Sequence, residues 1–65
     1  MPEILTIDEL ATLLKMSRRS VYEMTNARGR ERMSVPLPVL RINGSVRFRK
    51  QDIEKWLDEI AREAA

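Results

Sequence analysis

The 65-residue sequence contains no cysteine and no histidine, and it has only one residue each of Trp, Tyr and Phe. Without cysteine the chain has neither disulfides nor thiolate metal sites, and without histidine it lacks the common zinc ligand and the base of nucleophile–histidine pairs. No apolar run approaches the roughly 18 residues of a membrane span, and the N-terminus has no signal-peptide pattern. We therefore expect a cytoplasmic, non-enzymatic single domain over residues 1–65, with no metal, cofactor, small-molecule ligand or membrane contact.

Charge is unevenly distributed along the chain. The net charge is only +2, but the stretch from Lys15 to Lys50 holds ten lysines and arginines against two acids, and the remaining residues hold two bases against eight acids. Such segregation predicts a basic surface suited to a polyanion and an acidic surface that faces away from it.

The stretch from Thr6 to Ala27 predicts two short helices joined by a tight turn. Thr6 and Glu9 have the spacing of a capping box at the start of the first helix, and Ser17 is a suitable N-cap for the second. Lys15 occupies the turn position where glycine is common, so we expect it to have a positive φ. Helices separated by so few residues cross steeply, which predicts a helix-turn-helix.

The second helix begins with polar and basic residues, Ser17, Arg18, Arg19 and Ser20. Two arginines in a first turn oppose the helix dipole, so they are better explained if that end of the helix faces an anion. A recognition helix points its N-terminal residues into the DNA major groove, where Arg18 or Arg19 can bond a guanine. Tyr22 can cover the core edge while its hydroxyl reaches a phosphate. A solvated basic patch is the alternative.

The segment from Ala27 to Pro38 has no periodicity and predicts a loop, in which residues 30–33 can add a helical turn. Arg28, Arg30 and Arg32 can lie along a phosphate backbone, although a solubilising surface loop explains them equally well. We expect the end of this loop, at Leu37 and Pro38, to be anchored to the core.

The stretch from Val39 to Arg49 predicts a β-hairpin, because Asn43-Gly44 is a strong turn signal. A two-residue loop mixes apolar and charged residues on both faces, so we expect an odd-length loop that sorts them. The residues then expected to face the core are Leu40, Val46 and Phe48. Those expected on the outer face are Val39, Arg41, Arg47 and Arg49. Three arginines on one face predict a wing against phosphates, and edge-strand charges that discourage aggregation are the alternative.

The last predicted helix runs from Lys50 to Glu63, with an apolar stripe that includes Trp56 and with acids on its outer surface. Trp56 is interpreted as a core anchor rather than a base-stacking residue. Since the acids would repel DNA, this helix is expected at the back of the domain. The expected core comprises Ile7, Leu10, Ala11, Leu14, Met16, Val21, Met24, Leu40, Val46, Phe48, Ile53, Trp56, Leu57 and Ile60.

Two stretches, LTIDELATLLKMSRRSVYEM and LPVLRINGSVRFRKQDIEKWL, resemble the excisionase-type branch of the MerR-like winged helix-turn-helix DNA-binding domains. The resemblance spans almost the whole chain, and it implies a mainly α fold with a two-helix helix-turn-helix, a loop, a small β-hairpin wing and a C-terminal helix. Members of this branch include phage and plasmid excisionases, which bend DNA and direct site-specific recombination, and small transcriptional regulators of mobile elements. By position, the resemblance puts Arg18, Arg19 and Tyr22 on the recognition helix. It puts Arg41, Asn43, Ser45 and Arg47 on the wing. The segment from Ala27 to Pro36 is longer than in many relatives.

The sequence thus supports two classes of function. The first is sequence-specific binding of double-stranded DNA by several cooperating copies that bend it, either as an excisionase beside a site-specific integrase or as a transcriptional regulator. The second is a protein-interaction module whose acidic last helix docks an integrase or a polymerase. RNA binding fits the charge but lacks the exposed aromatic platform of single-strand readers. The candidate DNA-binding residues are Ser17, Arg18, Arg19, Ser20, Tyr22, Arg28, Arg30, Arg32, Arg41, Asn43, Ser45, Arg47 and Arg49.

Overall fold

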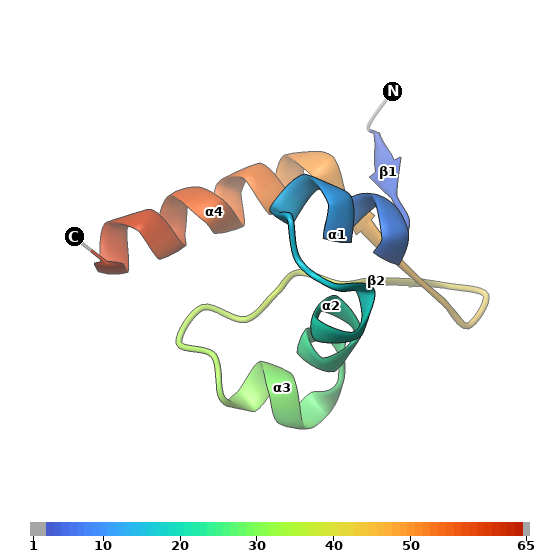
Figure 1. The fold of residues 1–65 in the computed structure, drawn as a ribbon, viewed down its shortest axis with the longest axis horizontal. Coiled ribbons are helices and arrows are strands. Elements are labelled where there is room, and N and C mark those ends of the chain that lie inside the picture. Colours follow the sequence, from blue (N-terminus) through green and yellow to red (C-terminus); the bar gives the residue numbers. More distant parts are fainter. Residues whose placement is uncertain (1–2, 65) are drawn as a thin grey trace.

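The computed structural model describes residues 3–64 and is mainly helical, with a small antiparallel sheet (Figure 1). In chain order the elements are β1 (Ile4–Leu5), α1 (Ile7–Leu14), α2 (Arg18–Thr25), α3 (Ala27–Glu31), β2 (Leu40–Ile42), β3 (Ser45–Arg49) and α4 (Lys50–Ala64). This confirms the predicted fold class. Met1, Pro2 and Ala65 lie outside the described residues. Within residues 3–64, no helix is long and apolar enough to cross a bilayer.

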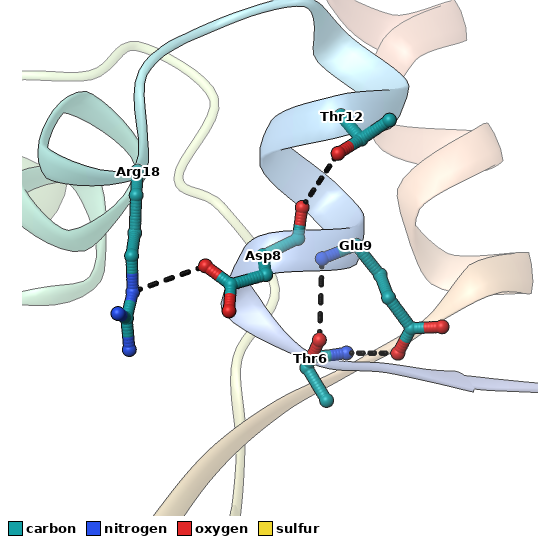
Figure 2. Close-up of polar contacts among 5 residues, drawn as sticks. All are labelled: Thr6, Asp8, Glu9, Thr12 and Arg18. Atoms are coloured by element: carbon teal, nitrogen blue, oxygen red, sulfur yellow. Dashed lines mark hydrogen bonds and ion pairs between the residues drawn. The ribbon is translucent and has the colours of Figure 1, made fainter.

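Helix α1 begins and ends as its local sequence predicts. The hydroxyl of Thr6 accepts a bond from the backbone N–H of Glu9 at 3.2 Å, and the Thr6 N–H donates to the Glu9 carboxylate at 3.0 Å (Figure 2). The helix ends at Lys15, which has a left-handed φ of 55°. The chain therefore turns sharply and restarts at Ser17, whose hydroxyl caps α2 through the Ser20 N–H at 3.1 Å.

A short third helix, α3, replaces the first part of the predicted loop, so the loop prediction is wrong for residues 27–29, and the helical turn expected over residues 30–33 begins earlier. Asn26 ends α2 and starts α3, with its Oδ1 accepting a bond from the Gly29 N–H at 2.7 Å. This N-cap makes the turn helical. Gly29 also allows close packing, because a Cβ there would overlap the carbonyl oxygen of Glu23 in α2.

The sheet has the strand order β1-β3-β2, and β1 is an element that the sequence analysis did not predict. Ile4 pairs with Arg49 and Leu5 with Phe48. The backbone N–H of Lys50 donates to the Glu3 carbonyl at 2.9 Å. These bonds fasten the start of the chain to the point where β3 passes into α4.

The hairpin has a two-residue turn, so the predicted odd-length loop is wrong. Ile42 pairs with Ser45, and Asn43 and Gly44 between them have φ values of 50° and 80°. Two positive φ angles define a type I′ turn, whose twist matches that of the flanking strands. The local preference of Asn-Gly for this turn therefore outweighs the sorting of side chains between two faces.

The observed register changes which residues share a face. Arg41 pairs with Val46, so these two residues share one face of the hairpin. Arg47 and Arg49 lie on the opposite face, because side chains alternate along a strand. Leu40 pairs with Arg47 and is not part of the core cluster. Val39, in contrast, packs against the core cluster. The expectation that three arginines share one face is therefore wrong, and so are the placements of Leu40 and Val39.

The core lies between α1, α2, the sheet and α4. Its buried apolar residues are Leu5, Leu10, Ala11, Val21, Leu37, Phe48, Ile53 and Trp56. The predicted core roles of Met16 and Leu57 are wrong, since they are 41% and 39% exposed. Leu37 is fully buried, so the end of the segment after α3 is anchored to the core as expected. Trp56 Nε1 also donates to the Val35 carbonyl at 2.9 Å, which ties the segment to α4.

Candidate nucleic-acid interface

The exposed side of α2 carries Arg19 and Glu23. Val21 and Thr25 are the buried residues of this helix. At about 100° per residue, Arg19 and Glu23 lie roughly 200° around the axis from Val21. They form an ion pair of 3.4 Å between Arg19 Nε and Glu23 Oε1, and their side chains are 89% and 63% exposed. Arg19 therefore projects away from the core, as a base-reading side chain must.

Arg18 lies along the flank of α2 and is paired with an acid from α1. Its Nε is 3.1 Å from Asp8 Oδ1, and the two terminal nitrogens of the guanidinium take no part in this contact (Figure 2). Asp8 is in the first turn of α1, where the helix dipole favours a carboxylate. We expected the acids outside Lys15–Lys50 to face away from the basic surface, and for Asp8 this is wrong.

A hollow of about 430 Å³ separates the first half of α2 from the hairpin, and we refer to it as the α2–wing hollow. Its lining residues are Thr6, Ile7, Asp8, Arg18, Tyr22, Ser45, Val46 and Arg47. Since β1 pairs only with Phe48 and Arg49, the edge of β3 beside this hollow is not covered by β1. The fold thus brings together four of the predicted residues, from segments far apart in the sequence.

Within this hollow, Arg47 Nη1 donates to the Val46 carbonyl at 2.7 Å, which holds its guanidinium near the strand. Apart from Ser45, the other predicted hairpin residues lie outside the hollow. Arg49 instead lies beside β1, and its Nε is 3.8 Å from Oδ2 of Asp52 in α4. Arg41 is exposed on the other face of the hairpin, and Asn43 is exposed at its tip.

The arginines after α2 line a different part of the surface. Arg28 and Arg32, one helical turn apart, line a second hollow with Glu23, Asn26 and Gly29, here called the α2–α3 hollow. Arg30 is exposed but is not among its lining residues. These arginines belong to a helix and its C-cap, so they cannot extend as the predicted mobile loop would.

The two serines at the start of α2 bond to each other. Ser17 Oγ donates to Ser20 Oγ at 2.8 Å and also accepts the capping bond from the Ser20 N–H. Asp8 and Glu23, the acids closest to the arginines of α2, were absent from the predicted site. The i,i+4 spacing of Arg19 and Glu23 was a usable signal, whereas no local pattern indicates the contact of Asp8 with Arg18.

Two helices joined by a tight turn, with a hairpin and a closing helix packed on the same core, have the architecture of a winged helix-turn-helix. A family model described as a helix-turn-helix domain matches residues 4–61, so the chain belongs to the helix-turn-helix domain family. This membership supports DNA binding. Searches among curated proteins and among solved structures found no match.

Proposed function

We propose that the protein binds double-stranded DNA sequence-specifically, with α2 in the major groove and the hairpin as a wing against the adjacent backbone. The observation that carries this proposal is the α2–wing hollow, where Arg18, Tyr22, Ser45 and Arg47 converge. The sugar-phosphate backbone of the DNA strand that separates a major groove from the next minor groove would pass between the recognition helix and the wing. Cationic and hydroxyl side chains at that point suit phosphate oxygens.

The two arginines in the first turn of α2 have different proposed roles. Arg19 projects from the side of α2 opposite the core, so it is the candidate for bonding guanine O6 and N7. Arg18 lines the hollow beside the wing, so it is the candidate for a phosphate contact. Asp8 would order Arg18 while lowering the positive charge of the hollow. Helix α4 runs along the side of the molecule away from α2 and α3 (Figure 1), so its acids beyond Asp52, which pairs with Arg49, would lie away from the DNA.

Within this function we propose the role of an excisionase. One small domain contacts few base pairs, so several copies would bind adjacent sites cooperatively beside a recombination site, bend the DNA and act with a site-specific integrase. The resemblance of the two long sequence stretches to excisionase-type domains supports this role. A transcriptional regulator with the same surface would occupy a promoter instead.

A second candidate function, docking of an integrase or polymerase on α4, is favoured by one feature of that helix. Leu57 is 39% exposed although it belongs to the apolar stripe, and the neighbouring Glu54 and Asp58 are exposed as well. An exposed apolar side chain with two exposed acids near it in the helix suits a basic amphipathic partner. Docking on α4 and DNA binding through α2 would use different surfaces and are compatible.

Fluorescence anisotropy with a labelled random-sequence duplex, titrated at several salt concentrations, tests DNA binding. The double variant Arg18→Ala/Arg47→Ala should lower the slope of log K against log salt by about 1.8, since each phosphate contact contributes about 0.9. The matched control Lys55→Ala/Arg62→Ala removes two positive charges from α4 and should leave the slope nearly unchanged. Absence of wild-type binding at about 50 mM salt, where several phosphate contacts are strongly felt, would refute the proposal.

Footprinting and recombination assays separate the finer roles. An excisionase should protect sites beside a recombination site and change the direction of integrase-catalysed recombination. Protection over a promoter, with a change in transcript level, would favour the regulator. Charge reversal at Glu54 and Asp58 should preserve DNA binding and abolish partner-dependent activity if α4 docks a protein. Loss of DNA binding in that variant would show that the proposed DNA face is on the wrong side.

A further inference from the structure

The side of α2 that points away from the core carries one acid, Glu23, beside Arg19. Only two acids occur between Lys15 and Lys50, and the other, Glu31, is the last residue of α3. A carboxylate on the surface of a recognition helix repels phosphates and lowers affinity for any DNA. Its presence there needs a reason.

Helix stability does not account for Glu23. An acid in the last turn of a helix opposes the dipole, and the order Arg before Glu at i,i+4 is the less favourable one. Both side chains of the pair are largely exposed, so solvent and salt screen their attraction. The close contact with Gly29 involves the backbone of Glu23 and not its side chain.

We propose that Glu23 is a specificity-determining residue that selects cytosine, next to a guanine that Arg19 reads. The inference rests on the proposed function. In the major groove, cytosine presents the N4 amino group as a donor, and a glutamate carboxylate can accept its hydrogen bond. The ion pair uses Nε of Arg19, so the fork of terminal nitrogens that fits guanine O6 and N7 is not occupied by Glu23.

The spacing of the two residues determines how far apart the two bases can be. Residues four apart in a helix are separated by about 6 Å along its axis, and base pairs are stacked about 3.4 Å apart. Arg19 and Glu23 therefore address bases within about two steps of each other. At guanine or thymine the carboxylate would be desolvated against acceptors only, and at adenine the N7 acceptor beside the N6 donor would repel it, so the wrong sequences are penalised.

Selection from a randomised duplex library tests the inference, with wild type, Glu23→Gln and Glu23→Ala compared. Wild type should enrich a motif with a guanine and a cytosine at most two steps apart. Glutamine bonds N6 and N7 of adenine, so Glu23→Gln should replace that cytosine by adenine and keep the guanine. In direct competition its preference for cytosine over adenine should fall at least about fivefold, and Glu23→Ala should lose the cytosine preference without gaining another.

The matched control is Glu31→Gln, which removes the same charge from the same basic stretch and should leave the selected motif unchanged. If Glu23→Gln selects the wild-type motif and, like Glu31→Gln, merely binds all sequences more tightly, Glu23 is only a charge and the inference is refuted. A wild-type protein that binds no DNA, or enriches no motif, instead refutes the proposed function on which the inference rests. Far-UV circular dichroism confirms that the exposed substitutions leave the helices intact.

Discussion

Replacing Gly29 by alanine should destabilise the protein, although alanine is the better helix former. A Cβ at this position would overlap the carbonyl oxygen of Glu23, and it would lie 3.0 Å from the carbonyl carbon and 3.2 Å from Met24 Cα. All three are backbone atoms of α2, so no change of rotamer can relieve the overlap. Helix α3 would have to move away from α2, which would also strain the Asn26 cap on the Gly29 N–H.

Two opposing effects determine the size of the change. Alanine favours a helix over glycine by about 0.8–1.0 kcal/mol. Overpacking against structure that cannot yield costs about 1–3 kcal/mol, and overlap with a backbone carbonyl belongs at the upper end. We therefore expect the free energy of unfolding to decrease by about 2 kcal/mol. For a domain of this size, that corresponds to a fall in Tm of roughly 10 °C.

Thermal unfolding followed by far-UV circular dichroism measures this effect. Arg30→Ala is the matched control, because Arg30 is an exposed residue of the same helix and its replacement should change Tm only slightly. A Tm of Gly29→Ala equal to or above that of the wild type would show that helix propensity dominates. The close packing of α3 on α2 would then be refuted.

Three further predictions concern other parts of the structure. Gly44→Ala should cost about 1 kcal/mol in thermal unfolding, because φ is 80° at Gly44 although its surroundings are open, and an unchanged Tm would contradict the type I′ turn. Trp56→Phe should cost about 1–2 kcal/mol in urea unfolding followed by circular dichroism, because the carbonyl of Val35 loses its donor, and a smaller loss would mean that water replaces this bond. Arg47→Ala should lower the salt slope of DNA binding by about 0.9. Arg49→Ala, outside the α2–wing hollow, should lower it less, and the reverse order would place the phosphates elsewhere.

The helices were predictable because their signals are local. The capping box of Thr6 and Glu9, the Ser17 cap and the left-handed Lys15 each involve residues a few positions apart, and all are present in the structure. Asn26 was a further local cap signal, and giving it more weight would have predicted α3. The Asn43-Gly44 turn is also a local signal, but the alternation of side chains favours an odd-length loop, and the type I′ preference of Asn-Gly prevails in the structure.

Other features of the fold depended on contacts between distant segments. Strand β1 is two residues long and has no pattern of its own, because it exists only through its pairing with Phe48 and Arg49. Met16 was expected in the core but is 41% exposed, because the described part of the chain covers the turn where it lies only in part. Leu37 lies between two prolines in an irregular segment, and its side chain is a core residue although the neighbouring Pro36 is exposed.

By itself, the sequence determined the kinds of side chain available for DNA: arginines at the start of a short helix and on a hairpin, with acids on the last helix. Tertiary structure decided which of them act together. Arg18 is paired with Asp8 and lines the same hollow as Arg47, because two crossing helices and an open strand edge come together there. No spacing along the chain encodes this arrangement. Local signals specify where helices and turns begin, since those bonds join near neighbours. The composition of a surface depends on how these elements pack against one another.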